Sequence, residues 1–128
     1  MAFRKQIKHL LTFFYIFFLI FFSGLDKLSA EEINWIEVAK INNELQYIDV
    51  NSIKYNNRGF LSVLTKYSEI NPEDHEIINT NSYLIAVDCD NRLFSKLPVN
   101  GDLKQVKNWD KPLNDKLIKK TIINSCSY

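Results

Sequence analysis

The sequence is poor in the residues that most catalytic and nucleotide-binding motifs require. It holds three glycines, three prolines, two cysteines and two histidines among 128 residues. It contains no glycine-rich phosphate loop, no G-x-S-x-G or S-x-x-K motif, and no C-x-x-C spacing. It also lacks a block of basic residues, so we expect no binding to nucleic acid. These absences leave no catalytic residue, cofactor site or metal site that a motif identifies.

One long hydrophobic run is present, and it lies close to the N-terminus. Leu10–Phe22 is a 13-residue run with one threonine, and basic residues at positions 4, 5 and 8 precede it. The run is shorter than the ~20 residues that a membrane-spanning helix needs, and this pattern is typical of a secretory signal peptide. Leu28-Ser29-Ala30 predicts cleavage after Ala30. The expected organisation is therefore a signal peptide over residues 1–30 and one domain over residues 31–128.

An uncleaved signal anchor is the alternative, because residues 23–25 lengthen the apolar run to 16 residues. In both cases the basic residues stay in the cytoplasm and the rest of the chain is translocated. Residues 1–30 contain no cysteine that could carry a lipid anchor. We therefore expect a periplasmic or secreted protein that meets the membrane only through its N-terminal segment, if that segment is kept.

Both cysteines lie in the expected mature domain. Four of the 16 basic and one of the 15 acidic residues precede residue 31, which leaves 12 bases, 14 acids and a net charge of −2. A cysteine pair in an exported chain predicts a disulfide, here Cys89–Cys126. Closing a loop of about 38 residues stabilises a domain by roughly 4 kcal/mol. A redox-active or metal-binding pair is the alternative, but His75 is the only histidine here and offers no recognisable ligand spacing.

The mature region is expected to begin with consecutive antiparallel strands. Short runs of β-branched and aromatic residues alternate with asparagine-rich breaks. Gly59 lies in one of these breaks and can take a positive φ. The predicted strands are Ile33–Lys40, Leu45–Val50, Phe60–Glu69, Ile77–Cys89 and Arg92–Leu97, with a short sixth strand before Trp109.

Period-two alternation indicates which side chains face the core. One face of the third strand carries Leu61, Val63, Thr65 and Tyr67, and one face of the fourth carries Tyr83, Ile85, Val87 and Cys89.

The last part of the chain changes to helical spacing. We expect Asn114 to be the N-cap, Asp115 to lie in the first turn, and Leu113 to pack against Ile118 as a hydrophobic staple. An apolar stripe continues towards Cys126; it consists of Leu117, Ile118, Thr121 and Ile122. The expected fold is α+β: an antiparallel sheet of about five to six strands, with one C-terminal helix packed on one face and tied to it by the disulfide.

Three groups of residues could carry function, and each also has a structural explanation. His75 lies in an acidic loop and could contribute to a metal site, but a solvated turn is favoured. Asp49 and Ser52 could form a contact site at a strand end, but their spacing favours capping of a local turn. The two tryptophans, Trp35 and Trp109, are expected to anchor the core or its edge.

Apolar residues point to both faces of two predicted strands. In the first strand these are Trp35 and Ile36, and in the third they are Phe60 and Leu61. Such a sheet can contact something on its second face, for which another subunit is one candidate.

A set of features runs in order along the mature region: Trp35, the segment Tyr47-Ile48-Asp49-x-x-Ser52-Ile53, Tyr67, Asp88-Cys89, Trp109 and Cys126. With this ordered set, the mature region resembles the surface-adhesin protein E family. The resemblance implies an exported protein with an antiparallel sheet and a C-terminal helix tied to it by the Cys89–Cys126 bridge. The best-known member of the family is a dimeric, lipid-anchored surface adhesin that captures host matrix proteins and plasminogen. No motif defines the family's binding segments, so no contact residues carry over.

We therefore expect a non-enzymatic exported binding module of the adhesin-E type, without cofactor or metal. Its expected ligand is a protein or an envelope component, and a homodimer is one expected assembly. The alternative is a structural or assembly factor of the cell envelope. A small periplasmic enzyme or inhibitor with a pocket around His75 is a third hypothesis.

Overall fold

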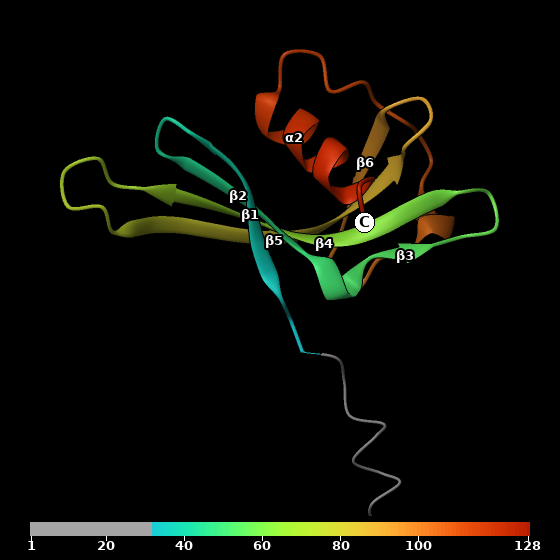
Figure 1. Cartoon of the computed structure of the whole chain (residues 1–128), viewed down its shortest axis with the longest axis horizontal. Helices are drawn as coiled ribbons and strands as arrows, with labels where there is room; N and C mark the ends of the chain where they lie inside the picture. Colours follow the sequence, from blue (N-terminus) through green and yellow to red (C-terminus); the bar gives the residue numbers. More distant parts are fainter. Residues whose placement is uncertain (1–31) are drawn as a thin grey trace, which may run out of the picture. The chain divides into compact units, whose positions relative to one another are not determined.

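In the computed structural model, which describes residues 32–128, six strands form an antiparallel sheet (Figure 1). Five of the strands lie in the order β1-β2-β4-β5-β6, and the short β3 pairs with β4. The expected signal peptide, residues 1–30, and its cleavage site lie outside the described residues. The strands are β1 (Trp35–Ile41), β2 (Glu44–Asp49), β3 (Lys54–Tyr55), β4 (Phe60–Ile70), β5 (Ile77–Asp88) and β6 (Leu93–Leu97).

Tight turns connect the neighbouring strands, and four of them place a residue in the left-handed region; these residues are Asn42, Gly59, His75 and Arg92. Asn42, in the two-residue turn between β1 and β2, has φ 55°, which asparagine tolerates better than most residues. Gly59 precedes β4 with φ 81°, as its predicted role in a turn requires. Because consecutive strands pair directly, the chain order and the sheet order nearly coincide.

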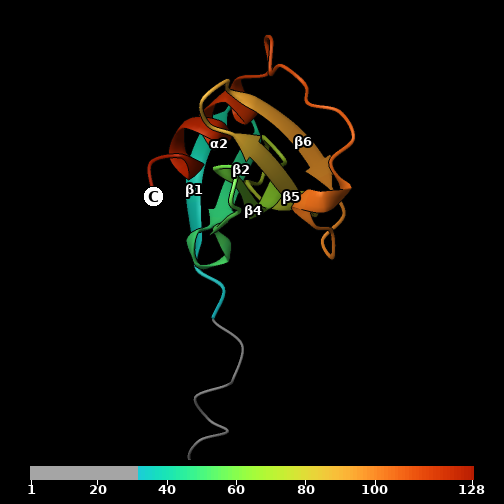
Figure 2. The ribbon, with the colours of Figure 1, turned by 90° about the vertical axis from the view of Figure 1, so that its right-hand side faces the viewer.

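The C-terminal helix α2 (Lys116–Ser125) packs on one face of the sheet, where it contacts β1 and β2 (Figure 2). Its apolar stripe meets the predicted core faces of the strands. No helix among residues 32–128 is long and apolar enough to cross a membrane. The central cluster has seven members, each at most 3% exposed: Ile48, Leu61, Val63, Ile85, Val87, Ile118 and Ile122.

A disulfide joins the end of β5 to the end of α2. The Cys89 and Cys126 Cα atoms are 5.9 Å apart, and both side chains pack against the core cluster. The predicted fold class and the predicted bridge are therefore confirmed. In this bonded state neither sulfur is free to ligate a metal.

The start of the helix differs from the prediction by one residue. Asp115, not Asn114, is the N-cap, and its carboxylate accepts a 3.1 Å hydrogen bond from the backbone N–H of Ile118. The predicted staple is also wrong, because Leu113 is 72% exposed and has φ 47°. Asparagine and aspartate are equally good N-caps, so sequence preference could not separate the two positions.

The sixth strand is not where the sequence placed it. It is β3, which precedes the Gly59 turn, whereas the segment before Trp109 forms the short 3₁₀ helix η2 (Leu103–Gln105). A capping box explains this helix, because the Asp102 and Gln105 side chains each bind the other's backbone. Near Trp109 the only described strand-like pairing is a single bridge between Phe94 and Asp110.

The second face of the sheet carries the two tryptophans. Trp109 is half-buried and packs on Phe60, with ring centroids 4.9 Å apart. Trp35 and Tyr47 hold the Lys66 ammonium between them, at 4.7 and 4.6 Å from their ring centroids. Both tryptophans are thus half-buried anchors at the margin of the fold, in agreement with their predicted role.

Candidate functional site

On the helix-covered face, the inward side chains of the strands change from apolar to polar where α2 no longer covers the sheet. Along β4 the inward row runs from Leu61 and Val63 to Tyr67, and along β5 from Val87 and Ile85 to Tyr83. The paired β2 row does the same, ending in Gln46 and Glu44. Beyond the reach of α2, a polar floor therefore takes the place of the hydrophobic core.

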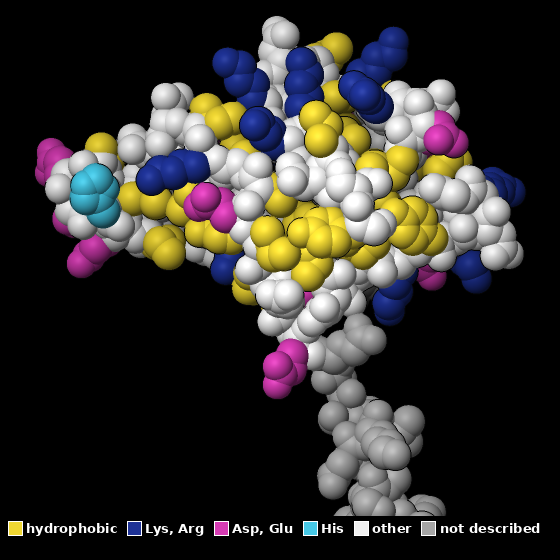
Figure 3. All heavy atoms as spheres, viewed as in Figure 1, with side chains coloured by type: hydrophobic (Ala, Val, Ile, Leu, Met, Phe, Trp, Pro, Cys, Tyr) yellow, Lys and Arg dark blue, Asp and Glu magenta, His cyan; other side chains and the backbone are white. Residues whose placement is uncertain are grey.

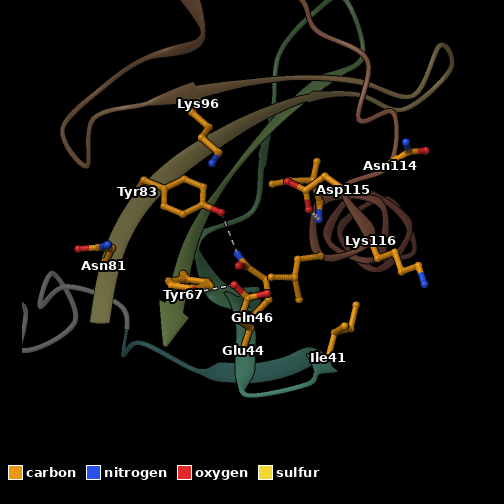
Figure 4. A pocket seen from close by; sticks show the side chains of 12 residues that line it. Ile41, Glu44, Gln46, Tyr67, Asn81, Tyr83, Lys96, Asn114, Asp115 and Lys116 are labelled. Atoms are coloured by element: carbon orange, nitrogen blue, oxygen red, sulfur yellow. Dashed lines mark hydrogen bonds between the residues drawn. The ribbon is translucent and has the colours of Figure 1, made fainter. Parts of the chain in front are cut away.

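A groove of about 570 Å³ lies over this polar floor, beside the start of α2 (Figure 4). β2, β4, β5 and β6 each contribute side chains to it, and residues 114–118 form one wall. Its volume falls in the range of about 300–1,000 Å³ that is common for ligand sites.

The Gln46 side chain is held rigidly at the bottom of this groove. It is 1% exposed, and its Nε2 donates a 3.1 Å hydrogen bond to the Tyr83 hydroxyl oxygen (Figure 4). Because this oxygen acts as the acceptor, the Tyr83 hydroxyl proton remains to be donated elsewhere. The Lys96 ammonium lies 5.0 Å from the centroid of the Tyr83 ring, which further fixes the ring. The pair thus presents ordered hydrogen-bonding groups to a ligand.

Tyr67 and Glu44 form a second ordered pair in the groove. The Tyr67 hydroxyl donates a 2.8 Å hydrogen bond to Glu44 Oε1. This hydrogen bond, together with burial and the negative charges of Glu44 and Glu69, raises the pKa of Tyr67 to about 12. Tyr67 is therefore a neutral hydrogen-bond donor at every physiological pH.

The Tyr67–Glu44 pair should be visible in an alkaline titration. Monitored by phenolate absorbance, one tyrosine should ionise near pH 12 in the native protein, and in Glu44→Gln its pKa should fall towards about 10. Because the folded-state pKa lies above the unfolded value, the native state holds this proton more tightly. The stabilisation is complete below pH 10 and is lost as the pH rises through 12. A late-ionising tyrosine that persists in Glu44→Gln would contradict this assignment.

Opposite charges balance along the groove. Its lining includes two acids, Glu44 and Asp115, and two bases, Lys96 and Lys116. The carboxylate of Asp115 is engaged as the N-cap of α2. A site with fixed donors and acceptors and no net charge suits a polar ligand without a strong charge, and it disfavours polyanions.

The residues that the sequence singled out do not gather at this groove. Asp49 is 4% exposed and accepts hydrogen bonds from the backbone N–H groups of Asn34 and Asn51. Ser52 donates to the Asp49 carbonyl and accepts from the Leu64 N–H, so the predicted turn interpretation is confirmed.

His75 is exposed in the turn between β4 and β5, where it has φ 59°, and it does not line the groove. Among residues 32–128, no three His, Cys, Asp or Glu side chains are grouped closely enough to hold a metal ion.

Sequence reasoning missed the groove itself. Tyr67 and Tyr83 were placed on the correct face, but only as part of the core, and Gln46 and Glu44 were not singled out. The usable signal was the shared parity of these residues with the aliphatic row of each strand. The sheet register decides which polar residues of neighbouring strands lie side by side, and the sequence pattern does not predict that register.

Comparison with known families agrees with this architecture. The family model described as the surface adhesin-E family matches residues 36–128. This range contains the helix and all six strands, except for the first residue of β1. The chain belongs to the surface adhesin-E family. No curated protein and no solved structure gives a significant match. Membership in the surface adhesin-E family and the Cys89–Cys126 disulfide both indicate a protein that works outside the reducing cytoplasm.

Proposed function

We propose that this member of the surface adhesin-E family is an exported, non-enzymatic module that binds a protein or envelope ligand in the groove beside α2. The observation that carries the proposal is the groove with its ordered polar floor, above all the buried Gln46 bonded to Tyr83. Such preordered groups favour binding, because little conformational entropy is lost when a ligand arrives. Family membership supports an adhesin-like role.

Export is part of the same proposal. Residues 1–30 direct the chain across the membrane and are removed after Ala30, which leaves a periplasmic or secreted domain. The disulfide supports an oxidising destination. N-terminal sequencing of protein purified from the periplasmic fraction would reveal the cleavage point, and recovery of the intact leader would favour the signal anchor.

A solid-phase assay with the exported protein tests the binding function. Matrix proteins and plasminogen are offered as ligands, and saturable binding is expected for at least one of them. In Lys96→Glu, which reverses a charge on the rim of the groove, affinity should fall about tenfold or more. The matched control, Lys119→Glu, makes the same charge change on an exposed helix residue outside the groove lining and should bind like wild type.

Two results would count against the proposal. If no ligand binds saturably, the adhesin role fails and the alternative, a structural or assembly factor of the envelope, is favoured. If Lys96→Glu and Lys119→Glu weaken binding equally, the ligand site is not this groove.

A further inference from the structure

Half of β5 has no strand on its outer side. β5 is 12 residues long and pairs with β4 along its length, but β6 pairs only with Leu84–Asp88. Along Ile77–Tyr83, the outward backbone N–H and C=O groups therefore meet no strand within residues 32–128. The β4–β5 hairpin that carries this edge extends away from α2 (Figure 1). The result is an open slot beside β5, in line with β6.

Proline closes one end of this slot. β6 ends at Leu97, and Pro98 follows with no N–H to continue the ladder. The chain then turns away, with the Gly101 N–H bonded to the Pro98 carbonyl at 2.7 Å. β6 therefore stops short of Tyr83, although β5 continues.

Between residues 79 and 83 the open edge lacks the devices that normally protect a free strand. A bulge lies only at the start of the edge, where β5 has one extra residue, Ile78, opposite β4. Residues 77–83 read Ile-Ile-Asn-Thr-Asn-Ser-Tyr, without charge, proline or glycine. Ile77 and Ile78 are 62% and 61% exposed. Natural edge strands usually carry lysine, proline or a bulge that prevents pairing with another chain. From residue 79 to residue 83 the edge has none of these features and is competent to accept a strand.

The same edge borders the groove. Asn81 and Tyr83 belong to it, and both side chains line the groove (Figure 4). A strand added beside them would direct every second side chain to the groove side of the sheet. In strand addition, main-chain hydrogen bonds supply affinity and pockets for alternate side chains supply specificity.

We propose that the ligand of this module is recognised through an extended polypeptide segment, which adds to Ile77–Tyr83 as an antiparallel strand and places alternate side chains in the groove. This inference rests on the proposed function, in which the groove is the ligand site, and it names the ligand class: a flexible stretch of a protein. The segment that pairs has an uncharged, β-prone centre, matching the uncharged edge.

Charge near the two ends of the slot fixes the polarity of the segment. The turn at the Ile77 end carries exposed acids at positions 73, 74 and 76, and the exposed Glu69 lies near the end of β4. Figure 3 shows acidic side chains in magenta near the histidine, in cyan. Lys96 lies on β6, close to the Tyr83 end. In the antiparallel direction set by β6, the C-terminus of the segment meets the acidic turn. A basic residue is therefore expected at its C-terminal end and an acidic residue at its N-terminal end.

A second copy of this chain fits the slot less well than a separate segment does. In a two-fold pair of β5 edges, the Pro98–Gly101 turn of each copy would face the 71–76 turn of the other at the end of the slot. A free segment has no such turn and can pair along the regular part of the edge, residues 79–83.

Selection from a random library of peptides of about 12 residues, displayed on phage against the exported protein, tests the inference. Selected peptides should share the uncharged centre and the terminal charges. Replacing the backbone N–H groups of one such peptide by N-methyl groups, one at a time, should weaken binding about tenfold at every second position and little between. Equal loss at all positions, or at none, would overturn strand addition.

Amide hydrogen exchange measured by NMR reports the protein side of the same interaction. With the selected peptide bound, alternate amides within residues 79–83, where β5 pairs regularly with β4, should gain about tenfold protection, since the others already bond to β4. Asn79→Lys adds a charge to the exposed edge and should weaken peptide binding about fivefold or more. Asn57→Lys, an equal change in the exposed turn before β4, should not.

The outcomes separate this inference from the proposed function. If whole proteins bind but no peptide is selected, strand addition is overturned and the adhesin role stands. If neither whole proteins nor peptides bind, the proposed function fails, and this inference fails because it rests on that function. If edge amides in the free protein gain protection as its concentration rises, a second copy occupies the slot and the proposal is overturned.

Discussion

Replacing Cys126 by serine is expected to lower the free energy of unfolding by about 4 kcal/mol under oxidising conditions. The bridge joins residues 37 positions apart and ties the end of α2 to the end of β5, so its loss frees a long stretch of the unfolded chain. For a domain of this size, the melting temperature should fall by roughly 15–30 °C. Thermal unfolding followed by circular dichroism measures the change.

Two controls make this result specific to the disulfide. Reductant should lower the melting temperature of the wild-type protein by a similar amount and leave Cys126→Ser unchanged. The double variant Cys89→Ser/Cys126→Ser removes the remaining thiol, which could otherwise form bonds between molecules, and should match the single variant. A melting temperature equal to that of wild type would show that the bridge does not hold the helix in solution.

Ile122→Ala in α2 is expected to destabilise the protein by about 2–4 kcal/mol. The side chain is 3% exposed and belongs to the cluster that joins the helix to β2, β4 and β5. Truncating it removes buried apolar surface and leaves a cavity that the sheet cannot fill by moving. Denaturant unfolding measures the loss as a lower midpoint with an unchanged slope.

The neighbouring residue provides a matched control. Ile123 is 55% exposed, so Ile123→Ala makes the same chemical change in the same helix without opening a cavity. Its effect should stay within about 0.5 kcal/mol of wild type. Equal destabilisation by the two variants would mean that α2 does not pack through the face that contains Ile122.

The local pattern was sufficient for most of the fold. Alternation along β4 and β5 identified the core faces, because side chains of a strand point alternately to its two sides whatever the rest of the chain does. It failed where neighbouring residues compete for one role, as Asn114 and Asp115 did for the N-cap. It also failed at residues 103–105, where a capping box between Asp102 and Gln105 forms a 3₁₀ turn in place of the expected strand.

The candidate site was much less accessible from the sequence. Gln46 meets Tyr83 across 37 residues, and Glu44 meets Tyr67 across 23. No periodic pattern in the sequence predicts these two contacts, because they depend on the lengths of the turns between β2, β4 and β5. The open edge is equally non-local, since it follows from the difference in length between β5 and β6.

The sequence by itself determined the apolar faces, the helical C-terminus and, with only two cysteines in the chain, the pairing that ties them together. The apolar faces and the helix follow from local periodicity, and two cysteines can form only one intramolecular disulfide. Tertiary structure alone decided where α2 stops covering the sheet, and hence which polar ends of three strands lie open as a groove. The physical reason is that burial and hydrogen bonding are properties of neighbours in space, and register and helix length bring those neighbours together only when the chain folds.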